Sequence, residues 1–94
     1  MGITRKSVRW SPHALDALID RKVERLEAAQ AIARPEFVVL DPPTGEVYMR
    51  RYFDALLGQE MLIRVVVEET DNELIEITVY KTSHGRRYLR GLLP

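Results

Sequence analysis

A few side chains in this sequence together supply the parts for cleaving a phosphodiester without a metal. That reaction needs a group that moves protons, a cation for the charge that develops on phosphorus, and a basic surface for the backbone. His13 is the candidate for proton transfer, since histidine is the usual proton shuttle near neutral pH. Arg64 is the candidate cation, while Thr78 and Tyr80 supply two hydroxyl groups.

Positive charge gathers at the two ends of the chain, although the formal net charge is zero. Residues 1–10 hold three basic side chains and residues 81–94 hold four, and neither stretch contains an acid. Basic ends on an acidic middle favour a local phosphate-binding patch. The predicted RNA-binding residues are Lys81, His84, Arg86 and Arg87; the alternative is two solvated basic tails.

Each of these residues also has a plainer interpretation. A lone histidine after a helix start, such as His13, is often a surface or capping residue. Arg64 has Glu68 and Glu76 as candidate cross-strand charge partners on a solvent-exposed face. Tyr80 is a favoured strand residue whatever its role.

Composition excludes several other classes of site. Cysteine is absent, so no disulfide and no thiolate ligand can form, which suits a reducing cytoplasm. Glu68 and Glu69 alternate across a strand, and no two histidines have helical ligand spacing, so we expect no metal. The scattered glycines form no phosphate-cradling loop, and no cofactor is expected. The N-terminus lacks the apolar core of a signal peptide, and no membrane segment is expected.

A helical region should position His13. Ser11 and Pro12 are typical of a helix start, because serine caps free N–H groups and proline at the first position loses no hydrogen bond. Apolar residues recur at helical spacing until Arg34-Pro35 ends the pattern. One long helix and two shorter helices with a bend at 22–24 both fit this segment.

The rest of the chain alternates as β-strands do, so the sequence predicts an α+β domain. A short first strand is expected at residues 7–10, and a candidate edge strand at 46–53. The other predicted strands are 37–40, 61–68 and 74–82. The last two form a hairpin whose core side is predicted to consist of Ile63, Val65, Val67, Ile75, Ile77 and Val79.

The other side of that hairpin is predicted to carry Arg64, Glu76, Thr78 and Tyr80. Alternation fixes which residues share a face, but it leaves the register open. One register sets Arg64 opposite Thr78. A shift of two residues sets Glu68 opposite Glu76, which is less favourable because like charges then meet.

Several motifs resemble those of a microbial and phage family of unknown function. SPHALDALIDRKV is similar to the opening helix of that family, where Ser-x-His-Ala is followed by an arginine at the position of Arg21. Pro35 matches a proline after the second helix, and MLIRVVVEE with LIEITVYKTS resembles the terminal hairpin. The family itself resembles the RelE and BrnT toxins, within the barnase, EndoU, colicin and RelE group of metal-independent ribonucleases.

The resemblance implies a single RelE/BrnT-like domain over residues 1–94. It implies two N-terminal helices packed on a three- to four-stranded antiparallel sheet, and hence a bend at 22–24. It also implies a toxin-like endoribonuclease that acts on RNA, with the ribosome as a candidate site of action and an antitoxin as protein partner. The residues that it implies for the site are His13, Arg64, Thr78 and Tyr80. Ala17 and Lys22 depart from the family pattern, which has Arg and Gly there. The alternative is a non-enzymatic protein- or RNA-binding module on the same scaffold.

Overall fold

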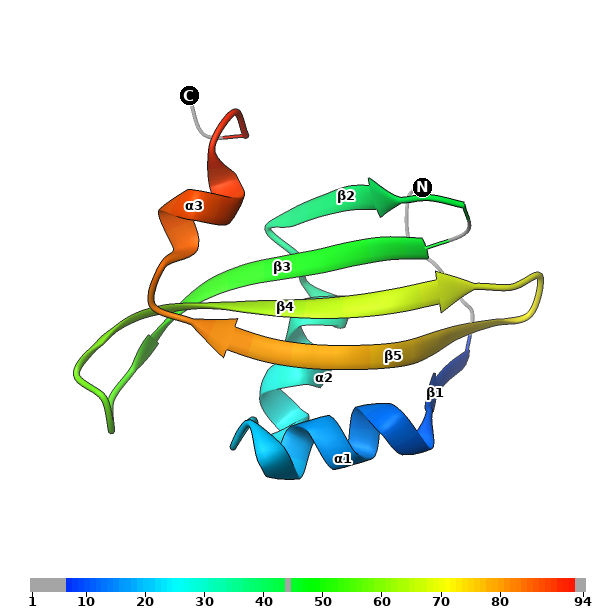
Figure 1. Ribbon diagram of the computed structural model, residues 1–94, viewed down its shortest axis with the longest axis horizontal. Coiled ribbons are helices and arrows are strands. Elements are labelled where there is room, and N and C mark those ends of the chain that lie inside the picture. The colour runs from blue at the N-terminus through cyan, green and yellow to red at the C-terminus, as the bar shows by residue number, and fades with distance from the viewer. Residues whose placement is uncertain (1–6, 44, 93–94) are drawn as a thin grey trace.

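The computed structural model describes residues 7–43 and 45–92. Within these ranges it confirms an α+β fold, in which helices pack on a sheet (Figure 1). The elements follow one another as β1 (Ser7–Trp10), α1 (Pro12–Asp20), α2 (Arg25–Ala33), β2 (Phe37–Asp41), β3 (Gly45–Asp54), β4 (Gln59–Glu69), β5 (Glu73–Thr82) and α3 (Gly85–Leu89).

The helical region consists of two short helices rather than one long one. The Ser11 hydroxyl caps α1 by accepting a hydrogen bond of 3.0 Å from the Ala14 N–H, as the sequence predicts. Lys22 then has a φ of 54°, a left-handed conformation that no helix continues through. A capping box between Glu24 and Glu27 starts α2, so the bend at 22–24 is confirmed.

The sheet is larger than predicted and is mixed. Its order is β1-β5-β4-β3-β2, and β1 runs parallel to β5, with Ser7 beside Glu73 and Trp10 beside Glu76. The expected three- to four-stranded antiparallel sheet was therefore wrong in strand number and in direction. Strand β3 is also not an edge strand, because β2 pairs along its free side.

The two faces of the sheet are covered differently. Helices α1 and α2 cover one face, where Ala17, Leu18, Val23, Ala28 and Ala31 pack on strand residues that include Tyr48 and Val65. We call the opposite side the outer face; it carries Val47, Met49, Leu62 and, two residues along β4, Arg64. Helix α3 lies against this face through Leu89, at one end of the sheet (Figure 1).

Helix α3 was not predicted, since the sequence indicated there only a basic stretch that forms either a phosphate-binding patch or a solvated tail. Its first residue, Gly85, lies so close to β4 that an added Cβ would be 3.3 Å from the Leu62 Cβ. Glycine therefore lets the helix start close to the sheet, and the buried Leu89 completes the contact.

A β-bulge sets the register of the terminal hairpin. From Leu62 to Val66 the strands pair in the second of the two registers considered above, the one shifted by two residues, and Arg64 lies opposite Tyr80. Val67 then pairs with Glu76, which leaves Ile77 as an extra residue on β5. Glu68 consequently faces Ile75 instead of Glu76, and the repulsion that made this register unfavourable is removed.

The bulge also corrects the predicted core. Ile63, Val65, Val67 and Val79 are buried as predicted, but Ile75 and Ile77 are only partly buried. Leu74 and Glu76 are buried in their place, so the prediction that Glu76 emerges beside Arg64 was wrong. The physical reason is that one inserted residue exchanges the two faces for every residue of β5 before it.

Candidate functional site

Arg64 lies on the outer face between two tyrosine rings. Its guanidinium carbon is 5.3 Å from the ring centroid of Tyr80 on β5 and 4.2 Å from that of Tyr88 on α3. The two rings meet edge to face, with centroids 6.2 Å apart. Three elements thus hold one cation by aromatic contacts, which are favourable for a guanidinium group.

The charge of Arg64 is not balanced by an acid. Among residues 7–43 and 45–92, no carboxylate forms an ion pair with it, and its buried Nε has no hydrogen-bond partner. Burial lowers the pKa of Arg64, while Tyr88 and Asp41 act in the opposite direction. Because arginine stays protonated in proteins, the outer face carries a partly desolvated positive charge that an external anion would stabilise.

Arg21 brings a second cation to the same place. This C-cap residue of α1 donates hydrogen bonds from one guanidinium nitrogen to the Thr78 hydroxyl at 3.0 Å and to the Val79 carbonyl at 3.2 Å. Its guanidinium carbon is also 5.6 Å from the Tyr80 ring centroid. It can reach this edge because β1 pairs with β5 only as far as Glu76.

The structure therefore brings Arg64, Thr78 and Tyr80 together, as the sequence predicts, and adds Arg21 and Tyr88. Sequence reasoning missed both additions. In the sequence analysis, Arg21 was named only because it matches an arginine of the similar family. Tyr88 belongs to a five-residue helix that is too short to show a helical pattern.

His13 is not part of this cluster. It is exposed at the start of α1, whereas the opposite end of the same helix carries Arg21. The two positions are eight residues apart, which is about 12 Å along the helix axis. A general base must lie within hydrogen-bond reach of the proton that it takes, so this position does not place His13 at a phosphate bound by Arg64.

Lys81 pairs with acids of the protein itself and is not open to a ligand. Alternation along β5 directs it to the side that α2 covers, away from Tyr80. There its Nζ lies 3.3 Å from the Asp54 Oδ2 and 3.8 Å from the Glu27 Oε1, and 17% of the side chain is exposed. Backbone N–H groups, that of Leu57 above all, and Lys81 together hold the pKa of Asp54 below its usual value.

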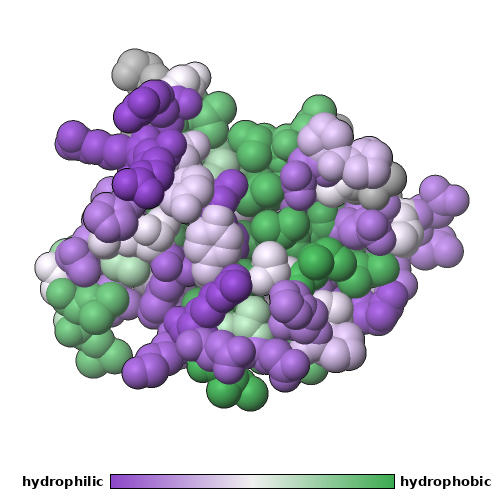
Figure 2. Space-filling model, viewed as in Figure 1, coloured by the Kyte–Doolittle hydropathy of each residue, from purple (hydrophilic) through white to green (hydrophobic). Residues whose placement is uncertain are grey.

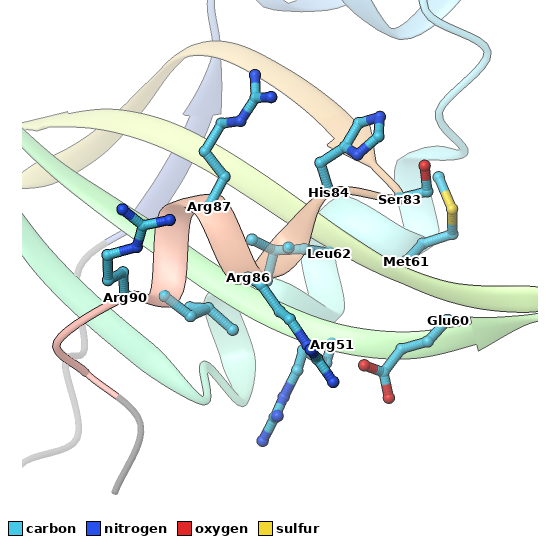
Figure 3. Close-up of a pocket in the computed structure, with 11 residues that line it drawn as sticks. Arg51, Glu60, Met61, Leu62, Ser83, His84, Arg86, Arg87 and Arg90 are labelled. Carbon is cyan, nitrogen blue, oxygen red and sulfur yellow. The ribbon is translucent and has the colours of Figure 1, made fainter.

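The remaining predicted RNA-binding residues meet at a pocket beside α3 (Figure 3). We call it the α3 pocket; its volume is about 500 Å³ and its polar lining residues are Arg51, Glu60, Ser83, His84, Arg86, Arg87 and Arg90. In the surface view, hydrophilic side chains gather over α3 (Figure 2). Arg51 and Arg90 were not predicted. Arg51 comes from β3, and only the folded sheet brings it beside α3.

Arg51 is fixed in place by an acid outside the pocket. Its Nε donates a hydrogen bond of 2.9 Å to Glu36, and a terminal nitrogen donates to the other oxygen of the same carboxylate. This pairing with Arg51 lowers the pKa of Glu36. No ion pair joins Arg86, Arg87 or Arg90 to an acid in the described part of the chain, so these three charges are available to a ligand.

These charges favour an anionic ligand. Across the two described ranges, no three His, Asp or Glu side chains gather as the ligands of a metal ion do. Nor does any described helix have the length and apolar character needed to cross a membrane. No family model, curated protein or solved structure matches the chain.

Proposed function

We propose that this protein is a metal-independent endoribonuclease of the RelE/BrnT kind that binds RNA across its outer face. The main support is Arg64, a partly buried guanidinium group with aromatic neighbours and no carboxylate partner among the described residues. Burying a charge without a partner is unfavourable, and a phosphate group would supply the missing partner.

Each neighbouring group has a role in this proposal. Arg64 stabilises the negative charge that develops on the phosphorane, because a cation held in a fixed position stabilises developing charge most effectively. Arg21 and Thr78 orient the phosphate, and the rings of Tyr80 and Tyr88 lie where unstacked bases can pack. Arg86 and Arg87 hold the neighbouring backbone phosphates.

Cleavage proceeds by attack of the ribose 2′-oxygen on phosphorus, with loss of the 5′-oxygen of the next nucleotide. The products are a 2′,3′-cyclic phosphate and a free 5′-hydroxyl. A base takes the 2′-hydroxyl proton and an acid returns one to the leaving oxygen. We propose His84 of the α3 pocket as the proton-transfer group, and we test the sequence-predicted His13, which lies away from Arg64, beside it.

The experiment that tests this function is cleavage of a labelled RNA in the presence of EDTA. Replacing Arg64 with alanine should lower the cleavage rate on the order of 100-fold, because an oriented charge at the reacting phosphate is lost. Arg64→Lys should retain part of the rate, since lysine keeps the charge but not the planar fork.

Arg9→Ala is the matched control, because Arg9 is an arginine of the edge strand β1 that already forms an ion pair with Glu73 and does not line the α3 pocket. Thermal unfolding of each variant excludes loss of the fold. Wild-type cleavage rates for Arg64→Ala, His13→Ala and His84→Ala would contradict the site assignment.

A non-enzymatic RNA- or protein-binding module is the second candidate. One observation favours it: the binding groups cluster at Arg64, whereas His13 lies at the other end of α1. This candidate predicts no cleavage and no growth arrest on expression. We also propose an antitoxin as partner of the toxin-like form, so co-expression of the neighbouring gene product should relieve any growth arrest.

A further inference from the structure

Strand β2 forms one edge of the sheet, and its residues do little to protect that edge. Among residues 7–43 and 45–92, only β3 pairs with β2, so the other side of β2 has no strand beside it (Figure 1). The sequence of β2, FVVLD, contains no proline or lysine, and its one charged residue, Asp41, stands at the end. Proteins usually block an exposed edge with such residues or with a bulge, because unpaired backbone groups recruit another strand.

The opposite edge of the sheet, β1, is protected in the usual way. This strand has only four residues, and the chain leaves it for α1 at Pro12. It also carries Arg9, a charged side chain that is 55% exposed. A short, charged edge resists the addition of a strand. Of the two edges, β2 is therefore the one that is open to pairing.

Strand β2 also exposes two apolar side chains on the same face. Val38 is 44% exposed and Leu40 is 80% exposed. Both lie on the helix side of the sheet, because Val38 is opposite Tyr48, which belongs to the core beneath the helices. Neither residue belongs to a core cluster. A neighbour along the free edge of β2 would cover both side chains.

We propose that β2 pairs antiparallel with β2 of a second copy of this chain, about a two-fold axis at Val39, so that the two sheets become continuous. The segment is self-complementary in this register. Val39 lies opposite Val39 of the second copy, and Val38 lies opposite Leu40. The two copies of Val38 and Leu40 then form one apolar cluster, and apolar pairs directly opposite one another stabilise a sheet.

Charge favours a second copy as the occupant of this edge. In the proposed register Asp41 lies opposite Phe37 of the second copy, so the two Asp41 carboxylates do not meet. The ring centroid of Phe37 is 5.8 Å from the guanidinium carbon of Arg51 in the same copy. Asp41 of one copy is thereby brought near Arg51 of the other, which is an attractive arrangement. One segment supplies both halves of the contact, as a two-fold interface requires.

This pairing places both outer faces on the same side of the joined sheet, because residues directly opposite in an antiparallel pair share a face. The two β4 strands, which carry Arg64, are then five strand spacings apart, or about 24 Å. A single RNA strand can contact both Arg64 clusters. This consequence for RNA rests on the proposed function, whereas the dimer does not.

The test is analytical ultracentrifugation of the full chain between micromolar and millimolar concentration. Two short edges make a small interface, so wild type should dimerise on concentration and dissociate on dilution. Leu40→Lys should remain monomeric throughout, because it places a charge in the apolar cluster and lysine blocks strand edges. Ile19→Lys is the matched control, since Ile19 is 76% exposed on α1 and should leave dimerisation unchanged. Thermal unfolding of each variant excludes loss of the fold.

Single cysteines test the register, because the chain has none of its own. In Val39→Cys the new residue faces its own counterpart with Cβ atoms about 4.5–5.5 Å apart, so mild oxidation should give a disulfide-linked dimer. In Leu40→Cys the new residue faces Val38 instead. This variant should not crosslink to itself, but it should crosslink to Val38→Cys when the two are mixed.

The outcomes separate the dimer from the proposed function. If wild type stays monomeric at every concentration, the inference is wrong, and a strand of another protein is the partner left for this edge. Dimerisation of Leu40→Lys as in wild type would place the contact elsewhere on the surface. A disulfide in Leu40→Cys alone, with none in Val39→Cys, would contradict pairing about Val39. If wild type dimerises but does not cleave RNA, the proposed function fails while the dimer stands.

Discussion

At the scale of single residues, two ionisable groups with buried atoms, one partly and one fully buried, have opposite relations to their surroundings. Arg64 and Glu76 each have buried side-chain atoms without a hydrogen-bond partner. Arg64 remains charged and opens toward the outer face, where a ligand can reach it. Glu76 is completely buried on the other face of the sheet and has no such access. The first is therefore suited to binding, and the second affects stability.

Glu76 should make stability depend on pH. Burial raises the pKa of Glu76 from 4.5 to about 7, and the charge of Arg25 opposes this rise only in part. Below pH 4.5, Glu76 is protonated in both the folded and the unfolded state, so its ionisation does not lower the free energy of unfolding. Between pH 4.5 and 7 only the unfolded chain ionises, so stability falls as pH rises, by about 3 kcal/mol in total at roughly 1.4 kcal/mol per pKa unit.

Urea unfolding at pH 5 and pH 8 measures this effect. Glu76→Gln should flatten the pH dependence and should be the more stable protein at pH 8. Glu73→Gln serves as the control, because Glu73 is only partly buried and already pairs with Arg9. An equal loss of stability in wild type and Glu76→Gln would show that another group titrates.

At the scale of elements, alternation in the sequence located the strands, but it could not show the bulge at Ile77 or the pairing of β1 with β5. A bulge depends on both strands of a pair, and β1 lies more than sixty residues from its partner. Thr78 and Tyr80 share a face with Arg64, as predicted, because the bulge lies before Thr78 in the chain. His13 did not join them, since the sequence gives no length or direction for α1 relative to β5.

The packing of helix α3 on the sheet determines whether the C-terminal arginines have fixed positions or belong to a solvated tail. Leu89→Ala should cost about 2–5 kcal/mol in unfolding free energy, because Leu89 is buried against Leu62 and Met49. RNA affinity should fall with it, since the arginines of α3 lose their fixed positions. Urea unfolding and anisotropy measure the two effects.

Leu92→Ala is the control for this experiment, because Leu92 lies just beyond α3 and is 40% exposed. If Leu89→Ala lowers stability but leaves RNA affinity unchanged, the arginines bind as a solvated tail, which is the alternative that the sequence left open.

At the scale of the whole molecule, zero net charge conceals an uneven distribution. The acids Glu36, Asp54 and Glu27 pair with basic residues, while Arg64, Arg86, Arg87 and Arg90 have no ion-pair partner among the described residues. Electrostatic attraction for RNA therefore comes from local charge and not from net charge.

Salt dependence measures how many of these charges meet phosphates. For a single strand, each neutralised phosphate contributes about −0.7 to the slope of log association constant against log salt concentration. If Arg64, Arg86 and Arg87 each contact one phosphate, the slope should be about −2. Arg87→Ala should reduce its magnitude by about 0.7, whereas Arg9→Ala should leave it unchanged, because Arg9 pairs with Glu73. A slope that stays the same in Arg87→Ala would place the RNA away from α3, and a slope near zero in wild type would mean that binding does not depend on these arginines at all.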